Sequence, residues 1–147
     1  MLEKVKILLV EDDLKTASLI YEILSSNSIY EIKWVENGAI AVEAALKETY
    51  DIVFMDVQMP VMDGIEATRT LRIAGYSGLI VALTAYFEKE KCLAAGMNDY
   101  IQKPFSMRDF IRKMNELNYK KGVGEEMKPA PQAEKIDIDK IFSKLNN

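Results

Sequence analysis

The chain has 147 residues, of which 49% are hydrophobic and 29% charged, a composition typical of one folded domain with a short remainder. Its net charge of −4, from 19 basic and 23 acidic side chains, lacks the basic excess of nucleic-acid-binding proteins, so we expect no direct contact with nucleic acid. The absence of histidine and the single cysteine exclude Ser-His and Cys-His catalysis, an internal disulfide and a zinc site of imidazole or clustered thiolate ligands within these residues.

The apolar stretches are too short to cross a membrane. The longest, at 78–87, is about half of the roughly 20 residues that a bilayer requires, and residues 1–11 lack the apolar core of a secretory signal. We therefore expect no membrane segment and a location in the reducing cytoplasm, where the lone Cys92 would stay a thiol.

Apolar runs alternate along the chain with segments in which apolar residues recur every three or four positions, so strands and helices are predicted in turn. In chain order, the predicted elements are a strand at 5–10, a helix at 14–25, a strand at 30–35, a helix from Asn37-Gly38 through Leu46, a strand at 51–55 that ends in Asp56, a helix through Ile65, Thr68 and Leu71, a strand at 79–83, a helix through 93–95 that ends at Gly96, a strand at 99–102, and a helix from the N-cap Ser106 to Leu117.

This alternation predicts an α/β fold, a doubly wound parallel sheet of five strands with helices on both faces. The strands are nearly continuous apolar runs, as burial on both faces requires.

The helical periodicity ends after Leu117. We predict a main domain at 1–118, then a linker at 119–135 rich in Lys, Gly, Glu and Pro. A short amphipathic helix at 136–147 follows, with its apolar stripe formed by Ile138, Ile141, Phe142 and Leu145. Such a short helix is marginal alone in water, so we expect it either to dock on its own domain or on a second copy in a homodimer, or to be a disordered connector to a further domain.

Polar side chains follow four of the predicted strands. Glu11 and Asp12 come after the first, Asp56 after the third, Thr84 after the fourth and Lys103 after the fifth. Each has an ordinary structural explanation when taken alone, such as helix capping or an Asx-turn for the acids. Ligands of open parallel sheets bind beyond the carboxyl ends of the strands, so their joint occurrence there indicates a site.

Several carboxylates in one pocket repel each other, so either their pKa values rise or a cation lies among them. Because the ligands available are oxygens, the cation expected first is Mg²⁺. Lys103 would add a second positive charge.

The chain resembles the receiver domain of bacterial two-component response regulators over about residues 4–118. The resemblance rests on four segments and is closest to receivers attached to hybrid sensor kinases. The segments are Lys6-Ile7-Leu8-Leu9-Val10-Glu11-Asp12-Asp13, Met55-Asp56-Val57-Gln58-Met59-Pro60-Val61-Met62-Asp63-Gly64, Ala82-Leu83-Thr84-Ala85 and Lys103-Pro104-Phe105.

The resemblance implies a flavodoxin-like strand order of 2-1-3-4-5 and a function as a phosphoacceptor. Asp56 would take a phosphoryl group from the phosphohistidine of a partner histidine kinase or phosphotransfer protein. Glu11, Asp12, Asp56 and the backbone carbonyl of Gln58 would hold Mg²⁺. The chain would be no enzyme beyond catalysing its own phosphorylation and dephosphorylation, and it would control a downstream protein target.

The remaining implied roles concern the switch. Lys103 would pair with the acyl-phosphate, Thr84 would move to hydrogen-bond a phosphoryl oxygen, and Tyr100 would turn inward with it. Gln58 and Tyr86 flank the site and would set the access of water to it. The segment between Thr84 and Lys103 is shorter than is usual in the family, which puts the usual output face around the fourth helix in doubt.

Two other functions share parts of this pattern. A Mg²⁺-dependent phosphatase of the haloacid dehalogenase type also uses an aspartyl nucleophile, but it typically has a second aspartate two positions later, where this chain has Gln58. A flavodoxin-like binding module needs a phosphate loop after the first strand, where Glu11 and Asp12 would repel a phosphate.

Overall fold

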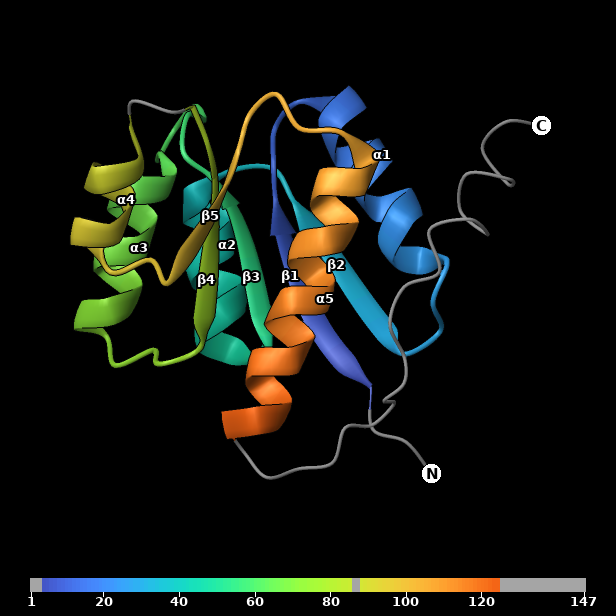
Figure 1. The fold of residues 1–147 in the computed structure, drawn as a ribbon. Coiled ribbons are helices and arrows are strands. Elements are labelled where there is room, and N and C mark those ends of the chain that lie inside the picture. Colours follow the sequence, from blue (N-terminus) through green and yellow to red (C-terminus); the bar gives the residue numbers. More distant parts are fainter. Residues whose placement is uncertain (1–3, 86–87, 125–147) are drawn as a thin grey trace. The chain divides into compact units, whose positions relative to one another are not determined.

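A five-stranded parallel sheet forms the frame of the structure, a computed structural model that describes residues 4–85 and 88–124 (Figure 1). Its order is β2-β1-β3-β4-β5, which confirms the predicted order 2-1-3-4-5. The strands are β1 (Val5–Val10), β2 (Tyr30–Val35), β3 (Ile52–Asp56), β4 (Leu79–Thr84) and β5 (Asp99–Gln102). The sheet lies within Lys4–Pro104, which is one compact unit, whereas residues 105–124 belong to another.

Helices cover both faces of this sheet, as a doubly wound fold requires. The helices in Lys4–Pro104 are α1 (Leu14–Ser25), α2 (Gly38–Lys47), α3 (Gly64–Ile73) and α4 (Lys89–Ala95). Alternate strand residues, such as Leu8, Val53 and Ile80, form one buried cluster with side chains of α2, α3 and α4. Helix α1 packs on β1 and β2 but contributes nothing to that cluster, so it covers the opposite face.

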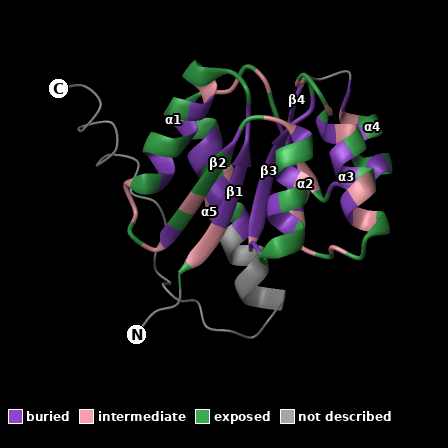
Figure 2. Cartoon of the chain, turned by 180° about the vertical axis from the view of Figure 1, so that it is seen from behind, coloured by how far each residue is buried: buried purple, intermediate pink, exposed green. Residues whose placement is uncertain are grey.

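Burial follows the predicted pattern. Figure 2 shows β3 buried along its length, and α2 with one buried and one exposed face. The internal strands β1 and β3 are apolar and buried over most of their length because helices cover both faces of the sheet.

Polar residues before the helices act as N-caps. The side chains of Asp13, Asn37 and Asp63 accept hydrogen bonds from backbone N–H groups in the first turns of α1, α2 and α3, respectively. Helix α4 ends, as predicted, at Gly96, whose φ of 114° places it in the left-handed region that favours glycine.

Helix α5 (Met107–Gly124) begins as predicted but ends later. The Ser106 hydroxyl accepts from the backbone N–H of Asp109 at 3.0 Å, and the Asp109 carboxylate accepts from that of Ser106 at 3.1 Å, a reciprocal capping box. The rings of Phe105 and Phe110 lie 5.9 Å apart and form a hydrophobic staple across this start.

The predicted linker at 119–135 is therefore wrong for its first six residues, which are helical. The segment 118–121 contains no glycine or proline. Its two lysines favour a helix and stabilise it near its C-terminus. The division at 118 into a main domain and a linker stays a prediction, and the helix predicted at 136–147 lies outside the described residues. In the described part of the chain, no helix combines the length and the apolar character needed to span a membrane.

The guanidinium group of Arg72 ties the end of α3 to the segments that enter β4 and β5. Its Nη1 donates to the carbonyls of Tyr76 and Gly78 at 2.8 and 2.9 Å, and its Nε donates to that of Gly96 at 2.9 Å. Its Nη2 donates to the Asn98 side-chain oxygen at 2.9 Å, which also accepts from the backbone N–H of Ile80. One planar fork thus satisfies four acceptors in two loops.

We expect Arg72→Lys to lower the free energy of unfolding by about 2 kcal/mol, because an ammonium group cannot reach four acceptors spread around a planar fork. Urea denaturation measures the change. Arg69→Lys, an exposed position on the same helix, is the matched control and should change stability by less than about 0.5 kcal/mol. Equal effects of the two substitutions would contradict the role of Arg72.

Candidate functional site

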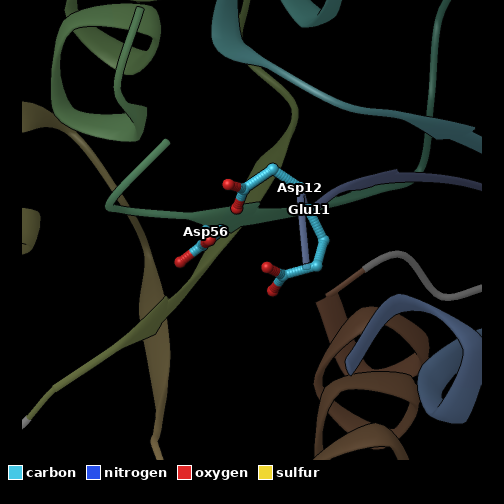
Figure 3. Close-up of side chains that lie close together, drawn as sticks. All are labelled: Glu11, Asp12 and Asp56. Atoms are coloured by element: carbon cyan, nitrogen blue, oxygen red, sulfur yellow. The ribbon is translucent and has the colours of Figure 1, made fainter. Parts of the chain in front are cut away.

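Three carboxyl groups lie together beyond the ends of the adjacent strands β1 and β3. Glu11 and Asp12 follow β1, and Asp56 is the last residue of β3 (Figure 3). One oxygen from each lies within 4.8 Å of the others. Glu11 and Asp56 are buried, with 0% and 4% of their surface exposed, whereas Asp12 faces solvent. The predicted acidic cluster is therefore present, with one side open.

Lys103 supplies the positive charge of the site. Its Nζ lies 3.0 Å from Asp56 Oδ1 and 3.3 Å from Glu11 Oε1. Its backbone N–H donates to the carbonyl of Thr84 at 2.8 Å, and its peptide bond to Pro104 is cis. One ammonium group therefore contacts both buried carboxylates.

The electrostatics favour a cation. Burial, together with the neighbouring carboxyl group of Asp56, raises the pKa of Glu11 to about 7. Burial also raises the pKa of Asp56, against the opposing contacts with Glu11 and Lys103. Burial lowers the pKa of Lys103, but Asp56 and Glu11 outweigh it, and the net pKa lies above the ordinary value. Lys103 alone therefore does not neutralise the two buried carboxyl groups.

Backbone contacts fix Glu11. Its N–H donates to the carbonyl of Val35 at 3.1 Å, and its own carbonyl accepts from the indole N–H of Trp34 at 3.0 Å. Its carboxylate accepts from the N–H of Asp13 at 3.1 Å. The sequence analysis missed Trp34, because an indole on a strand gives no local signal of a contact with a loop 23 positions away.

The loop after β3 brings the start of α3 against Asp56. A Cβ atom at Gly64 would lie 2.3 Å from the backbone oxygen of Asp56, so only glycine fits there. The N–H of Met62 donates to the carbonyl of Pro60 at 2.7 Å across Val61, whose φ is 71°. This is a strained γ-turn around a β-branched residue beside the site.

Thr84 and Gln58 lie at the site but form a separate hydrogen-bonded group. The buried Thr84 hydroxyl lies 3.2 Å from Glu88 Oε1 and 3.1 Å from the carbonyl of Ala85. The Gln58 side-chain amide donates to Glu88 Oε2 at 3.2 Å. The sequence analysis did not single out Glu88 as a site residue, because no local pattern marks it as a contact of Thr84 and Gln58.

The remaining predicted switch residue, Tyr100, lies on β5 opposite Ala82 of β4 and is half-buried. The ammonium group of Lys89, at the start of α4, lies 4.9 Å from the centre of its ring. Tyr86 lies outside the described residues.

Comparison with protein families identifies the fold and the site together. Residues 7–115 match the model of the response regulator receiver domain. The chain belongs to the response regulator receiver family. It is thus a receiver domain of two-component phosphorelay systems, and the phosphatase and flavodoxin-like alternatives are set aside.

Related sequences are parts of longer signalling proteins. The hybrid signal transduction histidine kinase B of Dictyostelium discoideum is 42% identical over 126 residues, which cover 74% of this chain and 6% of that protein. The sensor protein GacS of Pseudomonas syringae pv. syringae is 41% identical over 73% of this chain and 13% of its own length. The chain thus spans only a small part of these relatives.

Solved structures of receivers share the fold. The receiver domain of the sensor histidine kinase PA1611 from Pseudomonas aeruginosa, which holds a magnesium ion in its active site cleft, is 38% identical, with a TM-score of 0.70 over 77% of this chain and 96% of that one. The Saccharomyces cerevisiae Ssk1 receiver, solved with the phosphotransfer protein Ypd1, is 29% identical, with a TM-score of 0.70 over 79% of this chain and 90% of that one.

The pKa of Glu11 predicts a pH-dependent stability of the metal-free receiver. Because this pKa is raised on folding from 4.5 to about 7, the folded state binds the proton more tightly than the unfolded state. The free energy of unfolding should fall by about 2–3 kcal/mol between pH 5 and pH 8 on account of this group. The contribution is complete below pH 4.5 and is lost above about pH 7.

Urea denaturation at both pH values, with a chelator present, measures the effect. Glu11→Gln, which cannot ionise, is the control, and its free energy of unfolding should fall less over the same interval. A variant with the same pH dependence as the wild type would contradict the assignment.

Proposed function

We propose that Asp56 is the phosphoacceptor of this receiver. The single observation that carries the proposal is the position of its buried carboxyl group, which lies 3.0 Å from the Lys103 ammonium group and beside the acids Glu11 and Asp12. Phosphoryl transfer depends on positioning and on neutralisation of charge more than on the strength of the nucleophile. A carboxylate between a fixed cation and a cation-binding cluster meets both needs.

Glu11, Asp12 and Asp56, with the backbone carbonyl of Gln58, would hold Mg²⁺. Three carboxylates with oxygens within 4.8 Å of one another are the hard donors that Mg²⁺ prefers. Burial raises the pKa values of two of them, Glu11 and Asp56, so their charged forms need a compensating cation. When bound, the ion would neutralise charge on the phosphoryl oxygens. The magnesium ion held in the related PA1611 receiver supports the same choice here.

In the transfer, a bond forms between an Asp56 carboxylate oxygen and the phosphorus atom as the phosphorus–nitrogen bond of a phosphohistidine breaks. The electron pair of that bond stays with the imidazole. The 147 residues contain no histidine, so the donor lies outside them. A histidine kinase or a phosphotransfer protein is the partner proposed, as in the complex of Ypd1 with the Ssk1 receiver.

On the acceptor side, Lys103 balances the charge that arrives with the phosphoryl group. The chain catalyses only its own phosphorylation and dephosphorylation, and it acts on a downstream protein target without contacting nucleic acid. Thr84 and Tyr100 form the switch. A phosphoryl group on Asp56 attracts the Thr84 hydroxyl, and Tyr100 moves with it between two pre-existing arrangements.

Asp56→Asn should abolish phosphorylation, because an amide oxygen is too weak a nucleophile to form the acyl-phosphate. With Mg²⁺ and a small acyl-phosphate donor, intact-mass spectrometry of the wild type should show an increase of one phosphoryl group. No increase should appear when a chelator is present during the reaction. Asp63→Asn is the matched control, because asparagine also caps a helix and Asp63 caps α3. Equal labelling of Asp56→Asn and the wild type would overturn the proposal.

Thr84→Ala should still accept the phosphoryl group but respond less to it, because the hydroxyl that would contact the phosphoryl group is gone. Amide chemical shifts around Tyr100, recorded before and after phosphorylation, measure the response. Thr70→Ala, which removes a hydroxyl bonded only within α3, should respond like the wild type. If the shifts of Thr84→Ala change as much as those of the wild type, Thr84 is not the switch.

A further inference from the structure

Glu88 joins the two strand ends that flank the phosphoacceptor. Its carboxylate accepts from the Thr84 hydroxyl at the end of β4 through Oε1 and from the Gln58 amide after β3 through Oε2, both at 3.2 Å. Only 9% of the residue is exposed. Both oxygens of a largely buried carboxylate are therefore directed at residues that border Asp56.

The usual structural role of an acid at this position does not explain the arrangement. Glu88 precedes the first residue of α4 and is its N-cap, yet its side chain makes no capping hydrogen bond to that helix. Among the described residues, no lysine or arginine forms an ion pair with it, although buried carboxylates are normally paired. The charge of Glu88 is thus stabilised by the two side-chain donors, Thr84 and Gln58.

A hydroxyl group has one proton, so Thr84 can donate to one acceptor at a time. In this structure, the proton is directed at the Glu88 carboxylate or at the Ala85 carbonyl. A phosphoryl group on Asp56 would need the same proton, and its negative charge would also repel Glu88. The arrangement of Glu88 and the phosphorylated arrangement of Thr84 therefore exclude each other.

We propose that Glu88 is a positioning residue that holds Thr84 in the unphosphorylated arrangement and that phosphorylation of Asp56 must displace. This inference rests on the proposed function of Asp56 and deepens it. A contact that exists in only one of two states stabilises that state. A ligand that binds only to the second state is then bound more weakly, by the same free energy. Glu88 thus lowers the affinity of the site for a phosphoryl group.

The displaced carboxylate also gives the signal a route to α4. Glu88 directly precedes this helix, and the next residue, Lys89, lies over the ring of Tyr100. Loss of the Thr84 contact frees the start of α4, and the position of Lys89 over Tyr100 changes with it. The switch residues Thr84 and Tyr100 are in this way coupled through Glu88 and Lys89.

The test measures the affinity for beryllofluoride, which mimics a phosphoryl group on a carboxylate, by calorimetry of the full chain in excess Mg²⁺. Glu88→Ala removes the competing acceptor and should bind beryllofluoride about tenfold more tightly than the wild type. Glu88→Gln keeps a neutral acceptor and should bind about threefold more tightly. Glu90→Gln, an exposed acid in the first turn of α4, is the control for net charge and should match the wild type within about twofold.

The same substitutions in a Thr84→Ala background separate competition for the proton from simple repulsion. Without the hydroxyl, only the repulsion between Glu88 and the phosphoryl mimic remains, so the gain on changing Glu88 should shrink. Titration with Mg²⁺ alone should give the same affinity for the Glu88 variants as for the wild type, because the proposal places Glu88 outside the metal ligands. Circular dichroism melting of every variant checks that the fold is retained.

Three outcomes would overturn the inference while leaving the proposed function intact. They are unchanged beryllofluoride affinity in both Glu88 variants, an undiminished gain in the Thr84→Ala background, and a loss of Mg²⁺ affinity that would make Glu88 a metal ligand. A wild type that neither binds beryllofluoride nor gains a phosphoryl group would instead overturn the proposed function, and the inference with it.

Discussion

The parallel sheet holds carboxyl groups close together at the site although they repel each other, and the rest of the site compensates for this repulsion. Val10 of β1 pairs with Met55 of β3, so Glu11 and Asp56, the next residues of the two strands, meet at one edge. Burial raises the pKa values of both groups, and the neighbouring Asp56 raises that of Glu11 further. Lys103, which follows β5, offsets part of the negative charge of the two carboxylates. A bound cation can neutralise the remaining negative charge.

Such a cluster persists only if the backbone around it is held firmly. The indole of Trp34 and the carbonyl of Val35 fix Glu11 from the edge strand β2, and the close approach of Gly64 fixes the backbone at Asp56. Neither set of contacts involves the charged atoms themselves. The free energy that holds the carboxyl groups together therefore comes from hydrogen bonds and packing elsewhere in the sheet, and the site stays poised for a cation.

The second polar group, formed by Gln58, Thr84 and Glu88, gives the site a connection to the rest of the domain. Its three members come from the ends of β3 and β4 and from the start of α4. A change of charge at Asp56 acts on Thr84 and Glu88 at once, because both are largely buried and weakly screened. Glu88 lies in the segment whose shortness sets this chain apart from the usual family pattern, and it is the residue there that contacts both Thr84 and Gln58.

The sequence by itself determined the order and type of the elements, the caps at Ser106 and Gly96, and the residues at the strand ends, because these depend on local periodicity and on turn chemistry. The family motifs added the strand order and a role for Asp56. Only the tertiary structure decided which distant groups meet: Arg72 with the loops before β4 and β5, Trp34 with Glu11, and Glu88 with Thr84 and Gln58. The end of α5 was also missed, since a run without an apolar stripe can still continue a helix. These contacts join residues with no shared local pattern, so only the folded chain specifies them.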